Sequence, residues 1–185
     1  EQARTVPSSP AEAEVTPGRD DRTPGGKDSD AGTDGSAQRV EIDLASLEPR
    51  GFISPQNPAT RVAEEFRLIK RPLLQRALLS GVTGRAAAKG TAINRPNVIL
   101  VTSSRPREGK TFVAANLAIS MATERDVHVL LIDADVVNPM IFDTLGMEER
   151  PGLTEVLQDP SRDLGSVIMR TNVEKLSVMS AGSPH

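Results

Sequence analysis

An apolar run followed at once by a glycine-lysine-threonine loop is the feature that most restricts the fold of this 185-residue chain. The run covers residues 97–102, and the loop SRPREGKT covers residues 104–111. From Thr111 to Ala122, apolar residues recur at helical spacing. A buried strand, a loop and a helix in this order form a phosphate-binding unit, so we predict a strand at 97–102 and a helix at 111–122.

The loop departs from the pattern G-x-x-x-x-G-K-S/T because Ser104 replaces the first glycine. In such a loop, backbone N–H groups at a helix N-terminus hold phosphate, the Lys110 ammonium reaches the terminal phosphates and the Thr111 hydroxyl can bind Mg²⁺. The alternative is an ordinary turn at a helix start. We predict nucleotide contacts from nine consecutive residues, which are Ser104, Arg105, Pro106, Arg107, Glu108, Gly109, Lys110, Thr111 and Phe112.

A second apolar run, residues 127–132, predicts another strand and ends in Asp133-Ala134-Asp135. Ligands of open α/β sheets bind at the carboxyl ends of the strands, and Mg²⁺ prefers oxygen ligands such as carboxylates. We therefore predict that Asp133 and Asp135, together with Thr111, hold a metal ion, and that Lys110, Asp133 and Asp135 are catalytic. The alternative is that the two aspartates cap the helix that follows.

Three segments in sequence order carry a resemblance to a known family. The segments SRPREGKTFVAANLA and LLIDADVVNP resemble the Walker A and Walker A′ motifs of the bacterial tyrosine kinases of exopolysaccharide export, which are relatives of the MinD and ParA ATPases. The segment Glu64–Lys70 resembles the oligomerisation motif E-x-x-R-x-x-R of these kinases, with Lys70 in place of the last arginine. Segments 41–55 and 151–164 are most similar to the exosortase-associated subgroup of tyrosine autokinases.

Three residues depart from the family pattern. Arg107 stands where a glycine is usual, and Asn138 stands where these kinases usually have arginine. Arg105 occupies the place of the signature lysine of MinD-type ATPases. The resemblance nevertheless covers roughly residues 40–185.

The resemblance implies an α/β fold of the P-loop NTPase type, a doubly wound and mostly parallel sheet that is incomplete at its C-terminus in this chain. It implies an ATP-dependent protein-tyrosine autokinase that regulates the polymerisation and export of exopolysaccharide or capsule. The phosphoryl group would pass from Mg-ATP to tyrosines in the tail of a neighbouring subunit, within a homo-oligomeric ring formed through Glu64, Arg67 and Lys70. The implied partner is a transmembrane chain-length determinant protein, which would hold the cytoplasmic kinase at the inner membrane.

Two other functions stay open, a MinD/ParA-like ATPase switch and a non-catalytic relative. The chain contains no tyrosine, and no Walker B aspartate follows a further strand before His185. We therefore interpret the chain as a fragment of a longer protein and expect this fragment itself to be inactive. On spacing alone, Glu64, Arg67 and Lys70 could also form an ordinary solvated charged face.

The sequence divides into three parts by composition. Residues 1–39 are rich in Pro, Gly, Ser and acidic residues, so we predict a disordered tail. Residues 40–95 are expected to form a linker and an N-terminal helix region for oligomerisation, and residues 96–185 the first part of the kinase domain, truncated before Walker B. Further elements are predicted within these parts, namely helices at 59–79 (kinked near Pro72), 140–145 and 153–157, a connector at 81–95 and a strand at 176–179.

Composition excludes several other classes of protein. The net charge is −3 and the pI is near 5.5, so no general electrostatic attraction to nucleic acid is expected. The chain has no cysteine, which excludes disulfides and thiolate metal sites. No apolar stretch approaches the length of a membrane-spanning helix.

Overall fold

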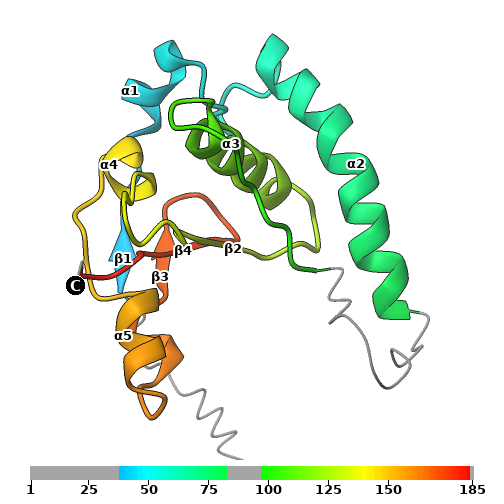
Figure 1. Cartoon of the computed structure of the whole chain (residues 1–185). Helices are drawn as coiled ribbons and strands as arrows, with labels where there is room; N and C mark the ends of the chain where they lie inside the picture. Colours follow the sequence, from blue (N-terminus) through cyan, green and yellow to red (C-terminus); the bar gives the residue numbers. More distant parts are fainter. Residues whose placement is uncertain (1–37, 83–96, 184–185) are drawn as a thin grey trace, which may run out of the picture. The chain divides into compact units, whose positions relative to one another are not determined.

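A four-stranded sheet organises the residues that the computed structural model describes, which are 38–82 and 97–183 (Figure 1). Its strands lie in the order β1-β3-β4-β2. The pairs β1/β3 and β2/β4 are parallel, and β3/β4 is antiparallel. The predicted α/β class with a mostly parallel sheet is therefore confirmed. The strand bounds are Arg39–Val40 for β1, Val129–Ile132 for β2, Met169–Thr171 for β3 and Leu176–Met179 for β4.

The strand predicted at 97–102 is wrong for this structure. Residues 98–102 have no strand assignment, and the side chains of Val98, Ile99 and Leu100 are 65%, 40% and 79% exposed. A strand exists only where a neighbour accepts and donates its backbone hydrogen bonds. Within the described residues the sheet ends at β2, whose partner is β4, so this apolar segment has no strand beside it.

Strand β2 is confirmed, but it is not buried on both faces as its apolar sequence predicts. Leu131 is buried, whereas Leu130 and Ile132 are each about 40% exposed. Successive side chains of a strand point to opposite faces, so one face of β2 is covered and the other is open. The covered face packs against α3.

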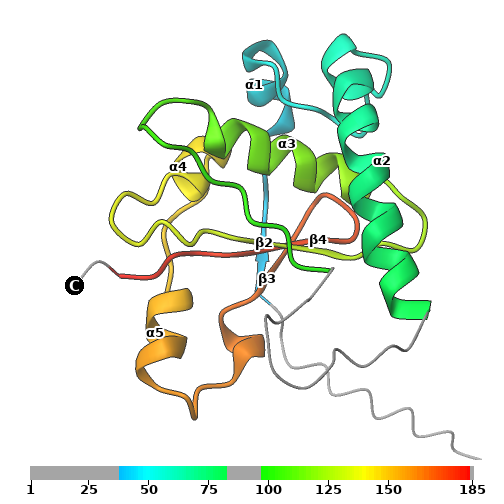
Figure 2. The same ribbon diagram turned by 45° about the vertical axis from the view of Figure 1, so that its right-hand side comes forward.

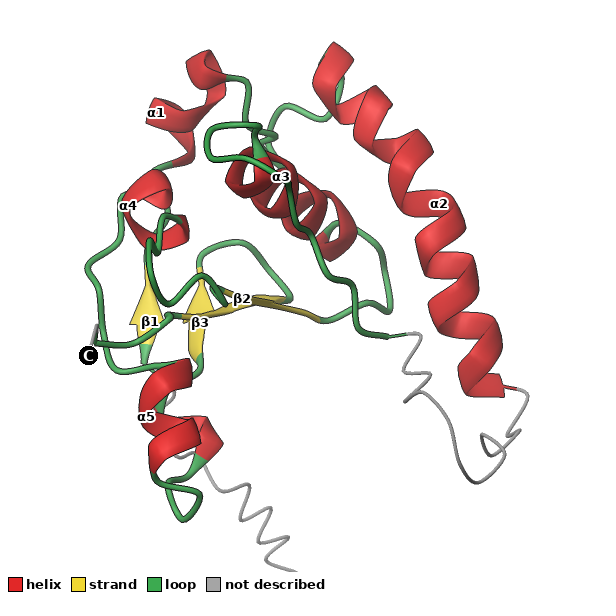
Figure 3. Cartoon of the chain, viewed as in Figure 1, coloured by secondary structure: helices red, strands yellow, loops and turns green. Residues whose placement is uncertain are grey.

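Helices α2, α3, α4 and α5 agree closely with the predicted ones, whereas α1 lies in the segment predicted as a linker. Figure 3 shows these five helices in red. Helix α2 is a single helix that contains Pro72, and Gly146 ends α4 in the left-handed conformation, with φ of 73°. Residues 1–37 of the predicted tail at 1–39 and residues 83–95 of the predicted connector at 81–95 lie outside the described residues. The two predictions fail at their described ends, because Arg39 belongs to β1 and residues 81–82 continue α2. The helix bounds are Leu44–Leu47 for α1, Arg61–Val82 for α2, Lys110–Ala122 for α3, Ile141–Leu145 for α4 and Leu153–Gln158 for α5, with short 3₁₀ turns at Glu48–Arg50 and Leu164–Ser166.

Helix α3 is the element around which the core is built. All of its residues from Ala115 to Ala122 are buried. It packs against β2 and β4 on one side and against α2 and α4 on others (Figure 2). Its start at Lys110 is the phosphate loop, so the position of the loop is set by the burial of this helix.

The segment predicted as a linker contributes to the same core. Ile42, Leu47, Phe52 and Ile53 are all buried. The amide side chain of Asn172 accepts a hydrogen bond from the Ile42 N–H and donates one to the Ile42 carbonyl, at 2.9 and 3.0 Å. Within the described residues no helix is long and apolar enough to cross a membrane.

A carboxylate ties α5 to the segment after β4. The Glu155 side chain accepts hydrogen bonds from the N–H groups of Gly152, at 2.6 Å, and Ser183, at 2.9 Å. Burial raises the pKa of Glu155, but these N–H donors outweigh burial and lower the pKa to about 2. The charged form of Glu155 therefore stabilises the fold.

This interaction predicts a pH-dependent stability. The folded pKa of about 2 lies below the ordinary value of 4.5, so the stabilisation is present above pH 4.5 and is lost as the pH falls toward 2. We expect Glu155→Gln to lower the free energy of unfolding by about 1 kcal/mol at pH 7, the usual size of a lost helix cap. The measurement is urea unfolding between pH 7 and pH 2.5, with the exposed Glu148→Gln as the control. A deficit that stays constant across this pH range would contradict the assignment.

Candidate nucleotide-binding site

The start of α3 has the backbone geometry of an anion site. Gly109 precedes the first helical residue with φ of 93°, a conformation that favours glycine. Among the described residues, no side chain caps this end of the helix. The first N–H groups of a helix have no partner within the helix, and the helix dipole places positive charge at the same end. The loop therefore presents donors to a phosphate.

Arg107 adopts the left-handed conformation, with φ of 66°. This is the position where the family pattern has glycine, and the structure shows the backbone requirement behind that preference. A residue with a side chain pays on the order of 1 kcal/mol to adopt this conformation. Arg107 therefore holds this backbone conformation at a cost in stability.

Glu108 folds the loop back on itself. Its carboxylate accepts hydrogen bonds from the Ser104 hydroxyl, at 3.3 Å, and from the Arg105 N–H, at 3.0 Å. The hydroxyl of Ser103 donates to the Arg105 carbonyl, at 3.0 Å. Ser104, which replaces the first glycine of the pattern, therefore holds the loop through its side chain.

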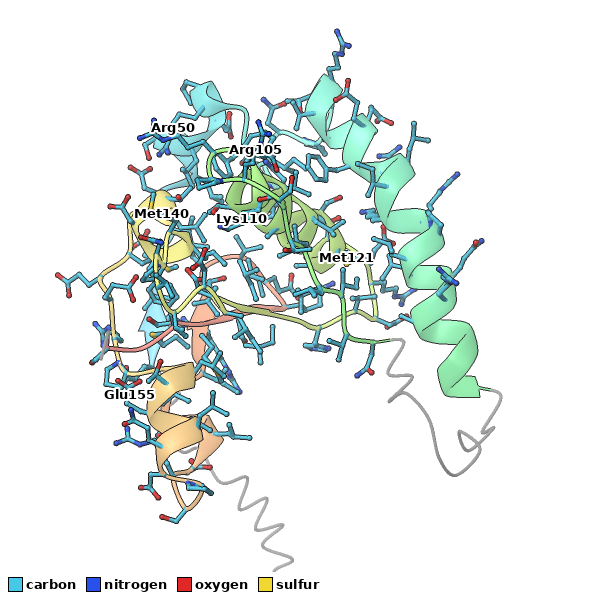
Figure 4. All side chains as sticks on the ribbon, in the orientation of Figure 1. Arg50, Arg105, Lys110, Met121, Met140 and Glu155 are labelled. Carbon is cyan, nitrogen blue, oxygen red and sulfur yellow. The ribbon has the colours of Figure 1, made fainter. Side chains whose placement is uncertain are left out.

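The structure brings Lys110 and Asp135 together. The Lys110 ammonium lies 2.7 Å from a carboxylate oxygen of Asp135, and both side chains are about one-third exposed. Figure 4 shows Lys110 at the start of α3. The hydrogen bond from Lys110, followed by the one from the Asn138 N–H, lowers the pKa of Asp135. The Asn138 contact uses its backbone, so it does not require the arginine that the family pattern has there.

Asp133 occupies a different environment from Asp135. It is 3% exposed, and its two oxygens accept hydrogen bonds from the N–H groups of Asp135, Met140 and Ile141, at 2.9–3.1 Å. Ile141 is the first residue of α4, so Asp133 caps the following helix, as the alternative interpretation of the sequence predicts. The catalytic and metal roles of Asp133 remain predictions, and it is Asp135 that contacts Lys110.

The donors near the loop fit a metal ion that arrives with a nucleotide. Across residues 38–82 and 97–183 no group of three or more His, Cys, Asp or Glu side chains could hold a metal ion. Mg²⁺ is commonly held by one or two carboxylates, with waters and phosphate oxygens as the other ligands. Thr111, Asp133 and Asp135 remain the predicted donors for such an ion.

The side chain of Phe112 packs into an aromatic cluster. Its ring centroid lies 5.1 Å from that of Phe52 and 6.4 Å from that of Phe66, both in edge-to-face geometry. Phe52, Phe66 and Phe112 are far apart in the sequence, and no spacing pattern links them. The cluster joins the phosphate loop to the segment before α2 and to α2 itself.

Glu64, Arg67 and Lys70 do not share one solvated face of α2, so the alternative of a common charged face is wrong. Glu64 and Arg67 are half-exposed and 3.3 Å apart, whereas Lys70 is 5% exposed and faces α3. An α-helix turns about 100° per residue, so each step of three residues drifts by about 60°. Lys70 is therefore rotated about 120° from Glu64 around the helix. The oligomer interface remains a prediction.

Residues 94–184 match the family model described as ParA, NUBPL iron-transfer P-loop NTPase. This part of the chain is a ParA-like P-loop NTPase domain. The domain also resembles the crystal structure of the chimerical protein CapA2B2, with a TM-score of 0.51 and 21% identity over 80% of this chain and 56% of that chain. That similarity concerns the fold.

The resemblance to bacterial tyrosine kinases is confirmed by individual relatives. The chain is 37% identical over 139 residues to the tyrosine-protein kinase YwqD of Bacillus subtilis, which is 75% of this chain and 48% of YwqD. It is 39% identical over 88 residues to the tyrosine-protein kinase ptk of Acinetobacter johnsonii, which is 48% of this chain and 12% of ptk. It is 40% identical over 87 residues to CpsD of Streptococcus pneumoniae, also named a tyrosine-protein kinase, which is 46% of this chain and 37% of CpsD. The chain thus spans half or less of the length of these relatives.

The strained backbone at Arg107 yields a stability prediction. Arg107→Gly relieves the left-handed strain but adds flexibility to the unfolded chain, whereas Arg105→Gly only adds flexibility. We expect Arg107→Gly to be more stable than Arg105→Gly by about 1 kcal/mol. The comparison is made by urea unfolding of both variants and the wild type. Equal stability of the two glycine variants would contradict strain at Arg107.

Proposed function

We propose that the full protein is an ATP-dependent protein-tyrosine kinase whose nucleotide binds at residues 104–112. The observation that carries the proposal is the contact between Lys110 of the loop and Asp135 at the end of β2. The direct contact of the Lys110 ammonium with the Asp135 carboxylate supports a phosphate-binding role for the first and a metal or proton-transfer role for the second. The tyrosine-protein kinase names of the relatives support the choice of reaction.

The chain's own groups would act mainly by positioning and by neutralising charge. The N–H groups at the start of α3 would bind phosphate oxygens, and the Lys110 ammonium would exchange the Asp135 carboxylate for a phosphate oxygen. The Asp135 carboxylate would then be free to accept the proton of a tyrosine hydroxyl or to hold a water on the metal ion. Mg²⁺, bound with the nucleotide near Thr111 and Asp135, would neutralise phosphate charge.

The setting of the reaction is proposed from the sequence motifs. The resemblance to kinases of exopolysaccharide export suggests control of polysaccharide polymerisation and export, with phosphorylation of tyrosines on a neighbouring subunit. A ring of subunits and a transmembrane chain-length determinant partner at the inner membrane complete this proposal. The exposed pair of Glu64 and Arg67 is the part of the motif that remains available to a second subunit.

A second candidate is a ParA-like ATPase switch. The match of residues 94–184 to the ParA model favours it, because that family shares the same nucleotide loop. In a switch, hydrolysis of ATP changes the association of the protein, and tyrosine is not an acceptor. The two functions differ in the fate of the phosphoryl group, which is transferred to protein in one and to water in the other.

The first prediction of this proposal concerns Lys110. In the full-length protein, Lys110→Met removes the phosphate-binding cation, so we expect tyrosine phosphorylation to fall by about 10²-fold or more while circular dichroism stays unchanged. The measurement is phosphotyrosine by mass spectrometry after incubation with Mg-ATP. Arg162→Met, at an exposed position, is the control. Unchanged phosphotyrosine in Lys110→Met would refute the kinase assignment, and ATP hydrolysis without phosphotyrosine in the wild type would favour the switch.

The second prediction concerns assembly. Replacing Glu64 and Arg67 together by alanine removes the exposed charges that the proposed interface uses, so we expect the full-length protein to become monomeric in light scattering. The matched control replaces Arg61 and Glu65, another exposed pair on the same helix, by alanine. An oligomer that survives the first change, or dissociates equally in the control, would remove these residues from the interface.

A further inference from the structure

Lys70 is a buried cation that the nucleotide site does not use directly. Its ammonium lies 2.6 Å from the Ser120 carbonyl, 3.2 Å from the Thr123 hydroxyl and 2.8 Å from the Glu124 carboxylate. A lysine ammonium has three donors, and these three acceptors match that number. The contacts tie α2 to the last turn of α3 and to the residues that follow it.

The chemistry of a helix end explains why an ammonium lies here. The last carbonyl groups of a helix have no N–H partner within it, and the helix dipole places negative charge at that end. The side chain of Lys70 is only 7% exposed, so its charge needs close partners to offset the loss of water. The Ser120 carbonyl and the Glu124 carboxylate supply them.

The N-terminal segment holds α3 at three levels along its length. At the first turn, the Phe112 ring packs against Phe52. In the middle, the fully buried Asn116 accepts a hydrogen bond from the Ile53 N–H, at 2.7 Å. At the last turn, Lys70 provides the third attachment, and it is the one made by a charge.

These attachments act on the phosphate loop because α3 starts there. A helix behaves nearly as a rigid rod with a rise of about 1.5 Å per residue, so an axial shift of its end is passed to its start. Phosphate binding depends on where the first N–H groups point, and a displacement of about 1 Å is large in such a site.

We propose that Lys70 is a positioning residue for the nucleotide loop. By fixing α2 to the C-terminal end of α3, it sets the position of the N–H groups at Lys110. This inference rests on the proposed function, because it assumes that residues 104–112 bind nucleotide. It also means that Lys70 acts within its own chain and that movements of α2 change nucleotide affinity.

The test compares nucleotide affinity in variants of the full-length protein. Lys70→Met keeps the length of the side chain and removes its charge, and Arg71→Met, at the next and exposed position, is the matched control. A fluorescent ADP analogue is titrated with Mg²⁺ present, at a temperature where circular dichroism shows both variants folded. We expect the Kd to rise roughly tenfold in Lys70→Met and to stay unchanged in Arg71→Met. An unchanged Kd in Lys70→Met, or an equal rise in both variants, would overturn the proposal.

A second variant and a second measurement keep the result interpretable. If Lys70→Met does not fold, Glu124→Gln removes the charge of one acceptor and should raise the Kd in the same direction by a smaller factor. Hydrogen exchange without nucleotide is measured in parallel, and faster exchange at residues 109–113 is expected. A change confined to residues 118–124 would overturn the proposal, since it would show a local cap only. A wild-type protein that does not bind the ADP analogue would refute the proposed function instead, and the exchange result would still decide the role of Lys70.

Discussion

The buried carboxylate of Asp133 is the constraint on which the site depends. It accepts hydrogen bonds from backbone N–H groups on both sides of the loop after β2. The N–H of Asp135 donates on one side, and the N–H groups of Met140 and Ile141 donate on the other. This fixes the turn that carries Asp135 and the start of α4 at the same time. Because the Asp133 N–H donates to the Met179 carbonyl of β4, the turn is also fixed to the sheet. The contact of Asp135 with Lys110 follows from a scaffold that Asp133 holds in place.

Short-range patterns in the sequence predict much of this structure. The helical spacing after Thr111 gives α3 to within one residue, and Gly146 gives the end of α4. The Walker A and Walker A′ motifs together predict that Lys110 and Asp135 lie close to each other. Ligands of an α/β sheet bind at the loop after one strand and at the end of its neighbour, where these two residues lie. Local sequence patterns do not indicate which distant segments of the chain come into contact. Strand β3 and the cluster of Phe52, Phe66 and Phe112 form through such partners, and the segment at 98–102 is apolar but has none among the described strands.

The two aspartates show how identical side chains come to lie in different environments. Both follow the same strand, and both were candidates for metal binding or helix capping. Asp133 is buried and accepts hydrogen bonds from three backbone N–H groups, whereas Asp135 is partly exposed and has a cation as its main partner. Sequence spacing does not distinguish them, since the difference arises from which one turns inward. A similar difference separates Lys70 from Glu64 and Arg67, where the turn of the helix decides which side chain is buried.

The open apolar side chains of this structure have a consequence for its behaviour in solution. Val98 and Leu100 in the segment before the phosphate loop, and Leu130 and Ile132 on β2, place apolar surface in contact with water. Such surface favours association between molecules, and salts that are excluded from protein surfaces, such as sulfate, strengthen that tendency. The apolar segment that precedes the phosphate loop is therefore expected to promote association of this chain at high protein concentration.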